Sequence, residues 1–322
     1  MNTHLTPSIH ASISGIHFFV GAGSSHRFSE QEDYDFPLGS CLFEGFKSHL
    51  RSVEPHQLPN EQKSWAIENL NEHESIDAFL GMAYCLGYCD LVTLGKKFVD
   101  REIIGCEQKV AKYFTDRSEL LILPWIRSFL DFMTQGAVSF EKAYEKLKSL
   151  DGNKNPAVNF ATLNYDRLIE VSLINYFIQK YPKEKEEITE SFQIEGNLVQ
   201  HHHGSLGPLQ ERPFGDAKEN PSPTLKFWFE YSDKPQHWPI MNAMSNARNH
   251  GVFLGFGFHQ SIATRFDFQG SKPKIYISDF GNELEGVIEK FLSTHELYAP
   301  TITNGADCCV ELIHELINRF SE

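Results

Sequence analysis

The sequence predicts an α/β protein, built on a Rossmann-like parallel sheet flanked by helices and carrying an all-helical insertion. Two observations support this fold class. The run Ile16–Val20 has the length and composition of a strand that is buried in a parallel sheet, and a glycine-containing turn follows it without a spacer. Further strand-like runs come only after a long stretch, residues 64–150, in which apolar residues fall at helical spacing and Gly and Pro are sparse.

Length and composition fit one large α/β domain with an insertion, although 322 residues would also suffice for two domains. We predict a single domain over residues 1–322, with the helical insertion at about 55–150. The chain is 41% hydrophobic, so it can bury a substantial core. Its net charge of −14 argues against broad binding of nucleic acid, because such binding depends on neutralising phosphates, and leaves room for a locally positive pocket.

Location and redox state are predicted from three features. No run approaches the apolar length that spans a bilayer, and the polar segment 1–12 lacks the layout of a signal peptide. The six cysteines form no CxxC pair, which argues against a structural zinc site. We therefore expect a cytoplasmic protein with no membrane contact and no metal, whose cysteines are reduced, small, apolar side chains.

The turn after the first strand is Gly21-Ala22-Gly23-Ser24-Ser25. Two glycines around one small residue let the chain turn sharply and leave backbone N–H groups open to an anionic ligand. A helix that begins near Ser24 would add a favourable dipole for phosphate. The full GxGxxG spacing is absent, since the third glycine position is His26, so a plain strand–turn–helix corner explains the turn equally well.

The segment that follows carries no chemistry that we can assign. Residues 26–35 are polar and acidic, and they form either a loop over a bound ligand or a surface connection. A helix is expected at 41–50. In the helical insertion, aromatic and Met side chains at helical spacing are expected to be core rather than a cofactor site, and the turn at 151–156 closes it.

The second informative stretch is residues 156–174. A strand is expected at 158–163, with Asn164-Tyr165-Asp166 at its carboxyl end and a helix after it. Ligands of open α/β sheets bind outside the carboxyl ends of strands, so Asn164 is expected on the same edge as the glycine turn. Asp166 is placed to cap the following helix. Capping alone for Asp166, and a simple turn amide for Asn164, are open alternatives.

A third stretch contains three histidines. Residues 192–200 look like a strand that ends in His201-His202-His203-Gly204-Ser205. Alternate residues of a strand share a face, so His201 and His203 would point together as in a metal site, but no carboxylate or Cys at ligand spacing supports a metal. We interpret His203, beside a glycine, as an exposed acid/base or ligand-orienting group. The charged run before it, 183–190, is expected to be a solvated loop or helix face.

Two more strands and a helix complete the chain. The run 251–258 is expected to be a strand that ends in a Gly-x-Gly turn at Gly255 and Gly257. Lys274–Asp279 is another strand, and Asp279 at its end could accept hydrogen bonds from ribose or adenine groups. From residue 305 onward the spacing of apolar residues predicts a terminal amphipathic helix.

Taken as an ordered set, these motifs resemble the SIR2-like (sirtuin-type) NAD-binding domain, in the branch found in bacterial antiphage defence effectors. The set is the glycine turn, Thr162-Leu163-Asn164-Tyr165-Asp166, His203-Gly204-Ser205, Leu254-Gly255-Phe256-Gly257 and the strand that ends at Asp279. It covers about residues 12–50 and 156–320. The resemblance implies that the glycine turn holds the dinucleotide phosphates and that Asn164, Asp166 and His203 line the nicotinamide-ribose site. It also implies that Gly255 and Gly257 lie near the adenosine half.

Two departures from deacylating sirtuins shape the expected activity. This chain lacks their four-Cys zinc module, and no Arg occupies the place that it has in their Gly-Ile-Pro-Asp-Phe-Arg type loop. The resemblance therefore implies an NAD+ glycohydrolase that cleaves NAD+ to nicotinamide and ADP-ribose. In this enzyme Asn164 would position water and ribose, His203 would act as general base, and Asp166 would support the pair.

The resemblance also implies a setting, that of an antiphage defence effector which depletes cellular NAD+ when activated. Since the chain has no recognisable sensor domain, we expect an activating or inhibiting partner protein, or homo- or hetero-oligomerisation, to control a latent enzyme through the helical insertion. Two alternatives stay open. One is a non-hydrolytic module that senses NAD or ADP-ribose and gates a partner, which could retain Asn164 and His203. The other is a protein deacylase, which the missing zinc module disfavours.

Overall fold

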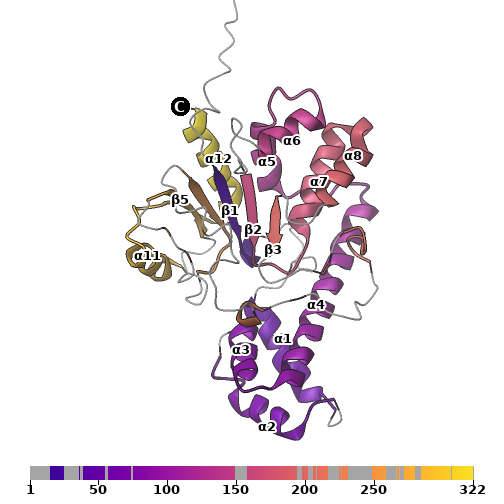
Figure 1. The fold of residues 1–322 in the computed structure, drawn as a ribbon, viewed down its shortest axis with the longest axis vertical. Coiled ribbons are helices and arrows are strands. Elements are labelled where there is room, and N and C mark those ends of the chain that lie inside the picture. The colour runs from indigo at the N-terminus through magenta and orange to yellow at the C-terminus, as the bar shows by residue number, and fades with distance from the viewer. Residues whose placement is uncertain are drawn as a thin grey trace, which may run out of the picture.

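The architecture comes from a computed structural model of the chain, drawn in Figure 1. A central sheet lies among helices, and a lobe of helices projects beyond one edge of the sheet. The structure describes residues 15–24, 36, 39–54, 57–73, 75–148, 158–193, 198–201, 206–207, 209–216, 225, 227–230, 249–258, 266, 268, 272–279, 284–305 and 307–321.

In the described part of the chain, six strands form one parallel sheet in the order β3-β2-β1-β4-β5-β6. The strands are β1 (Ile16–Val20), β2 (Val158–Thr162), β3 (Val199–His201), β4 (His250–Leu254), β5 (Lys274–Asp279) and β6 (Thr301–Asn304). The first strand of the chain is central, because Ile16 pairs with Val158 on one side and with His250 on the other. The direction in which strands are added reverses between β1 and β4. The predicted α/β fold with a Rossmann-like parallel sheet is therefore confirmed.

Between β1 and β2 the described residues form helices and their connections, as the sequence predicts. After a 3₁₀ turn, Ala22–Ser24, come α1 (Gly39–Ser52), α2 (Asn60–Asn69), α3 (Ile76–Cys85), α4 (Cys89–Asp116), α5 (Pro124–Met133) and α6 (Phe140–Lys148). The first four form the lobe, which lies beyond the arrowheads of β1 to β3 in Figure 1 and thus at the carboxyl edge of the sheet. Helix α5 instead packs against α7 and α12 beside the sheet. No helix in the described ranges has the length and apolar character needed to cross a membrane.

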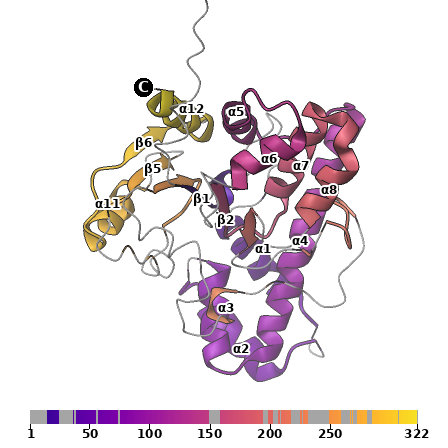
Figure 2. The same ribbon diagram turned by 45° about the horizontal axis from the view of Figure 1, so that its top comes forward.

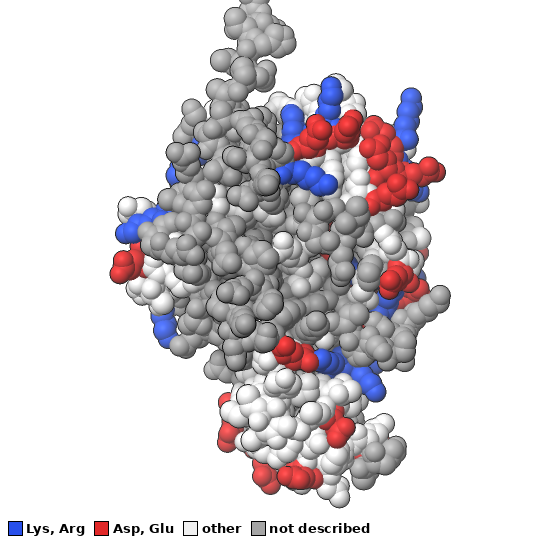
Figure 3. Space-filling view, viewed as in Figure 1, with Lys and Arg blue, Asp and Glu red and all other residues white. Residues whose placement is uncertain are grey.

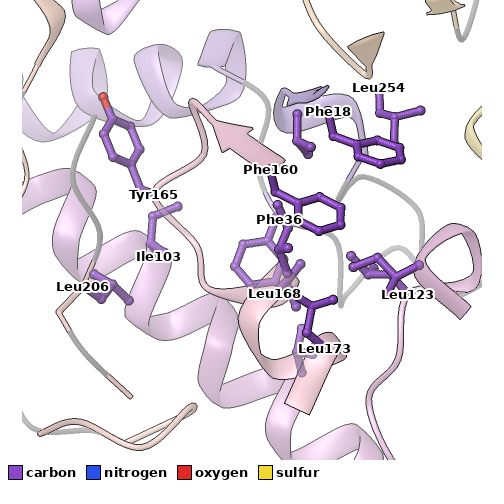
Figure 4. Close-up of a cluster of buried hydrophobic side chains, with 14 of the residues drawn as sticks. Phe18, Phe36, Ile103, Leu123, Phe160, Tyr165, Leu168, Leu173, Leu206 and Leu254 are labelled. Atoms are coloured by element: carbon purple, nitrogen blue, oxygen red, sulfur yellow. The ribbon is translucent and has the colours of Figure 1, made fainter. Parts of the chain in front are cut away.

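Helices cover both faces of the sheet (Figure 2). Among the described residues after β2, the helices are α7 (Leu168–Lys180), α8 (Lys185–Gln193), α11 (Glu285–Thr294) and α12 (Cys308–Ser321), with 3₁₀ turns at Pro182–Glu184 and Trp228–Glu230. Helices α5, α7 and α12 pack on the face that carries Phe18, and α11 packs on the face that carries Phe19. In Figure 4 the first of these cores extends from Phe18 and Phe160 of the sheet to Leu168 of α7. All five residues of β1 are buried, which fits a strand covered on both faces.

The charged run 183–190 forms a solvated helix face, one of the two forms predicted for it. Ile188 is fully buried, whereas Glu186, Glu187 and Glu190 of α8 are exposed. Figure 3 shows red acidic side chains gathered at the upper right, where α8 lies in Figure 1. Ile188 therefore packs this part of the helix against the core while the acidic residues around it face water.

The sequence-based prediction is wrong for part of one strand and misses two elements. The strand expected at 192–200 begins only at Val199, because Phe192 belongs to α8 and stacks on Phe177 of α7 with ring centroids 5.7 Å apart. Strand β6 and helix α11 are not predicted. The sequence of β6, Thr-Ile-Thr-Asn, is short and half exposed, so its pairing with β5 depends on tertiary contacts rather than on a sequence pattern.

Candidate active site

The carboxyl ends of β1 and β4 meet at the point where the strand order reverses. In open α/β sheets the crevice at this point is where ligands bind. The turn after β1 contains Gly21, Ala22, Gly23 and Ser24, and the turn after β4 contains Gly255 and Gly257. Ser25 lies outside the described residues. Glycines from the start and from the last third of the chain therefore come together at one place.

These two turns touch through their main chains. A Cβ atom on Gly21 would lie 2.4 Å from the carbonyl oxygen of Gly255, and one on Gly255 would lie 2.1 Å from the amide nitrogen of Ser24. A Cβ on Gly23 would lie 3.0 Å from the Cα of Gly255. Gly255 also has a φ of +55°, a conformation that favours glycine. We call this contact of Gly21, Gly23 and Gly255 the glycine lock, and it has no room for a side chain.

Three amide groups of the first turn are already engaged. Gly21 N–H donates to the carbonyl of Leu254 at 2.9 Å, and Gly23 N–H donates to the carbonyl of Gly255 at 3.2 Å. Ser24 N–H turns back to Gly21 at 3.0 Å, in a 3₁₀ turn rather than the start of an α-helix. The prediction that these groups are open to an anion is therefore wrong for Gly21, Gly23 and Ser24. The reasons are the end of β4 and the turn after it, which engage Gly21 and Gly23, and the 3₁₀ turn itself, which engages Ser24.

Asn164 lies on the same edge as the glycine turn, as the sequence predicts. It is buried, and its side-chain Nδ2 donates to the carbonyl of Gly21 at 3.2 Å. Its main-chain N–H donates to Oγ1 of Thr162 at 2.9 Å, which holds the residue at the end of β2. Because a carbonyl only accepts hydrogen bonds, Nδ2 must face Gly21 and Oδ1 faces the other way. The side chain therefore presents its acceptor on the side turned away from the glycine lock.

Asp166 is a buried carboxyl group, and burial raises its pKa to about 7. A hydrogen bond from the main chain of Leu168 and the charge of His201 lower this pKa, whereas the charges of Glu107 and Glu170 raise it. The bond from Leu168, 3.1 Å long, supports the first turn of α7, although Asp166 stands one residue before the N-cap. Asp166 thus supports the helix and also titrates near neutral pH, which capping alone does not explain.

Asp166→Asn is expected to stabilise the protein at about pH 8 by about 2 kcal/mol or more, and to lose this advantage toward about pH 4. Between pH 3.8 and about 7 the folded state binds a proton that the unfolded state has released, so wild-type stability falls as pH rises through this window. Asparagine keeps an acceptor for Leu168 and carries no charge. Urea unfolding of both proteins at the two pH values measures the effect. Equal stability at the higher pH would contradict it.

The neighbours of Asp166 tie the helical lobe to this edge. Tyr165 donates its hydroxyl to Asp77 of α3 at 2.9 Å. Arg167 forms a two-pronged ion pair with Glu107 of α4, with nitrogen–oxygen distances of 3.1 and 2.5 Å, and both side chains are almost fully buried. Figure 4 shows Tyr165 beside Ile103 of α4 in the hydrophobic cluster. The lobe therefore contacts the site, although its sequence pattern indicates no chemistry.

Arg167 also fixes the loop after β3. Its guanidinium donates to the carbonyl groups of Gly207 at 3.2 Å and of Arg212 at 2.5 Å. Gly215 of the same loop packs closely on α4, since a Cβ there would lie 2.5 Å from the Cβ of Ala111. One buried arginine thus joins the end of β2, the lobe and the loop that follows β3.

His201, the last residue of β3, contacts the loop after β2. Its Nδ1 lies 3.1 Å from the main-chain oxygen of Asn164, and its Nε2 lies 2.5 Å from Oε1 of Glu170 on α7. His203 lies outside the described residues, with Gly204 and Ser205, so the structure does not place the predicted general base. The sequence marks His201 only as one of three histidines, and nothing in the pattern marks Glu170.

On the other side of β4, Asp279 ends β5 as predicted. It is buried, and its Oδ2 accepts the N–H of Leu284, just before α11, at 3.2 Å. Ser278 accepts the N–H of Gly255 through its hydroxyl oxygen at 2.9 Å, which joins β5 to the glycine lock. Gly257 is exposed beyond the turn. The residues assigned to the adenosine half therefore lie along the β4–β5 part of the edge, where Asp279 also holds the start of α11.

Within the described ranges, no group of three or more His, Cys, Asp or Glu side chains is arranged to hold a metal ion. All six cysteines belong to the described part of the chain and are free thiols. Cys308 is buried, Cys106 and Cys309 are half-buried, and Cys41, Cys85 and Cys89 are exposed, so only some of these thiols contribute to the core.

The strand order and the glycine lock define a doubly wound α/β protein with a candidate ligand site at the carboxyl edge of its sheet. Its particular features are Asn164 and Asp166 beside the lock and a helical lobe tied to the loop that carries them. Compared with known proteins, the chain matches no family model and no curated protein. The resemblance to SIR2-like domains stays a prediction from the motifs.

Proposed function

We propose that the protein is an NAD+ glycohydrolase with a SIR2-like domain, which cleaves NAD+ to nicotinamide and ADP-ribose. The observation that carries this proposal is the hydrogen bond from Asn164 to Gly21, 3.2 Å long. It joins the residue expected to act on the nicotinamide ribose to the turn expected to hold the dinucleotide. The strand order supports the proposal, since dinucleotides bind where the order of such a sheet reverses.

The bond to be broken joins the nicotinamide ring nitrogen to C1′ of the ribose. The nicotinamide leaves with the electron pair of this bond and becomes neutral, and the ribose passes through an oxocarbenium-like state. Water then bonds to C1′ and releases one proton, so the products are nicotinamide, ADP-ribose and a proton. The site must therefore hold the ribose, admit one water molecule and stabilise positive charge near C1′.

Asn164 and Asp166 have the chemistry for these tasks. The Oδ1 of Asn164 faces away from Gly21 and can accept a hydrogen bond from water or from a ribose hydroxyl. Asp166, with a pKa of about 7, is partly ionised at neutral pH, so it can stabilise positive charge or take up a proton. The role of general base falls to His203 on the motif resemblance alone, and the ordinary pKa of histidine suits it.

Asn164→Ala is expected to lower NAD+ cleavage by about 100-fold or more, measured on purified protein as nicotinamide and ADP-ribose separated by chromatography. Asn175→Ala is the matched control. Asn175 lies on α7 away from the site, and its side chain donates one hydrogen bond, 3.0 Å long, to the main chain at Leu121. Both variants lose one hydrogen bond made by a side-chain amide. A loss of NAD+ cleavage that is confined to Asn164→Ala is therefore an effect on the site rather than on folding.

Three outcomes would refute parts of this proposal. Wild-type turnover by a folded Asn164→Ala protein would remove Asn164 from the mechanism. If the wild type, also tested in cell extract with its natural partners present, binds NAD+ without cleaving it, the sensor replaces the hydrolase. Release of the acyl group from an acylated peptide would instead identify a deacylase.

We further propose that the enzyme is a latent, cytoplasmic antiphage defence effector, acting by abortive infection and controlled by a partner protein or by homo- or hetero-oligomerisation. The motif resemblance supports the setting. The contacts Tyr165–Asp77 and Arg167–Glu107 support control through the lobe, since they join α3 and α4 to the loop that carries Asn164. In phage-infected cells, NAD+ is expected to fall with the wild type and to persist with Asn164→Ala. Persistence with both would refute the defence role.

A further inference from the structure

A chain of hydrogen bonds runs from α7 through β3 and the loop after β2 to the glycine lock. Its links are Glu170 to His201 at 2.5 Å, His201 to the main-chain oxygen of Asn164 at 3.1 Å, and the Asn164 side chain to Gly21 at 3.2 Å. We propose that Glu170 and His201 form an ion pair that positions Asn164 for catalysis. The positioning role rests on the proposed function, whereas the ion pair itself can be tested without it.

The groups on either side of the His201 ring decide its protonation. The main-chain oxygen of Asn164 can only accept, so the hydrogen of that bond is on Nδ1. At 2.5 Å, Nε2 and the Glu170 oxygen must share a hydrogen as well, because a bare ring nitrogen and a carboxylate are both acceptors. Imidazole is ordinarily more basic than a carboxylate, so this hydrogen belongs to the ring. The pair is therefore an imidazolium beside a carboxylate.

The surroundings of His201 favour the charged ring. Burial lowers the pKa of His201. Four contributions raise it by more than burial lowers it: the charge and the hydrogen bond of Glu170, the bond to Asn164 and the charge of Asp166. The pKa of His201 therefore lies above its ordinary value. These acidic groups come from α7 and from the loop after β2. Asp166 in turn faces Glu107 of α4, whose charge is engaged in the buried ion pair with the lobe.

The Glu170–His201 pair acts on the main chain of Asn164. Asn164 stands between β2 and α7, outside both elements, so no regular ladder of hydrogen bonds fixes its peptide groups. Thr162 holds its N–H and His201 holds its carbonyl, so the peptide planes on both sides of the residue are fixed, and the direction of the side chain with them. A charged donor holds a carbonyl more strongly than a neutral one. Loss of the charge would loosen Asn164 without removing a group that touches the substrate.

The second oxygen of Glu170 also indicates that the pair is retained for its charge. In the part of the chain that the structure describes, Oε2 is buried and has no hydrogen-bond partner. The carboxylate is therefore aligned through Oε1 on His201 alone. Burying a carboxylate with one oxygen unsatisfied costs free energy, unless attraction to an oppositely charged partner offsets that cost. A pair retained for its charge fits this arrangement better than a packing contact does.

Glu170→Gln tests the ion pair, because it keeps the shape of the side chain and removes the charge. Nitrogen-15 NMR of the imidazole groups follows the protonation of His201, with His201→Gln to assign its signal and His49 of α1 as an internal reference. At about pH 7.5 we expect an imidazolium in the wild type and a neutral ring in Glu170→Gln, because the variant loses the two largest contributions that oppose the effect of burial on the pKa, the charge and the hydrogen bond of Glu170. The His49 signal is expected to stay unchanged.

Steady-state NAD+ cleavage by the same proteins tests the positioning role. The kcat of Glu170→Gln is expected to fall by about 10-fold or more with KM within about 2-fold, since a catalytic group that is misplaced costs rate rather than binding. The deficit relative to wild type is expected to shrink as pH falls, because His201 of the variant is protonated again below its lowered pKa. Asp166 titrates in both proteins, so the ratio of the two rates largely removes its contribution. A merely structural loss would not recover at low pH.

The possible failures can be told apart. A neutral His201 in the wild type at about pH 7 would overturn the ion pair. A wild-type kcat in Glu170→Gln, in protein that cleaves NAD+, would overturn the positioning role and leave the hydrolase intact. If no preparation of the wild type cleaves NAD+, the proposed function fails and the positioning role fails with it, whatever the NMR signal shows.

Discussion

Alanine in place of Gly255 is expected to lower the free energy of unfolding by about 3 kcal/mol or more. Its φ of +55° alone costs a residue with a side chain about 1–2 kcal/mol. The added Cβ would also lie 2.1 Å from the nitrogen of Ser24 and 2.3 Å from the carbonyl carbon of Gly23. Both neighbours are main-chain atoms, so no side chain can rotate aside, and the turns after β1 and β4 must separate.

Gly105→Ala is the matched control for this substitution. Gly105 lies inside helix α4, and a Cβ there would meet no other atom within 4 Å. It is expected to stabilise the protein by about 0.5–1 kcal/mol, because alanine restricts the unfolded chain and favours helix. Urea unfolding of both variants gives the comparison. A loss below about 1 kcal/mol for Gly255→Ala would mean that the two turns are not in main-chain contact.

Glu107→Gln is expected to cost about 3–5 kcal/mol, because it leaves the charge of Arg167 buried without a counterion. The side chain of Arg167 is 1% exposed and that of Glu107 is 2% exposed, so water cannot compensate for the lost carboxylate. The carbonyl groups of Gly207 and Arg212 still accept hydrogen bonds from Arg167, but they carry no full charge. The lobe and the loop after β3 are expected to loosen together.

A surface ion pair supplies the control for the buried one. Glu315 and Arg319 lie one turn apart on α12 at 2.8 Å, and both are more than 40% exposed. Glu315→Gln is expected to change the free energy of unfolding by less than about 1 kcal/mol, since water and salt screen such pairs. Unfolding of both variants in guanidinium chloride measures the difference. Equal losses would show that the Arg167–Glu107 pair is solvated.

The sequence predicts those parts of the fold that local pattern determines. Ile16–Val20 is predicted as a strand because its short, apolar, β-rich run fits a strand covered on both faces, and all five residues are buried. Asn164 is placed beside the glycine turn by the rule that parallel strands end at one edge, and its hydrogen bond to Gly21 confirms that neighbourhood. The terminal helix from residue 308 follows from the spacing of its apolar residues.

The rest depends on contacts between distant segments. The amide groups of Gly21 and Gly23 are engaged because the turn after β4 lies against them, and local sequence around the first turn contains no trace of this. In the sequence, Glu107 resembles any acidic residue of an amphipathic helix, and only the folded structure shows that it pairs with Arg167. In the same way, the role of Glu170 depends on its contact with His201, which lies 31 residues later in the sequence. Charges that pair across the fold leave no periodic signal in the sequence.

The central position of β1 has a consequence for the order in which the protein can be made. Strand β1 emerges first from the ribosome, but one of its two neighbours, β4, lies in the last quarter of the chain. Pairings of such high sequence separation form slowly, so one side of β1 stays unpaired after β2 has been made and until β4 follows. The glycine lock cannot close before Gly255 arrives. A nascent chain thus has no assembled site before Gly255 has been made, and the proposed NAD+ hydrolase would stay inert until then.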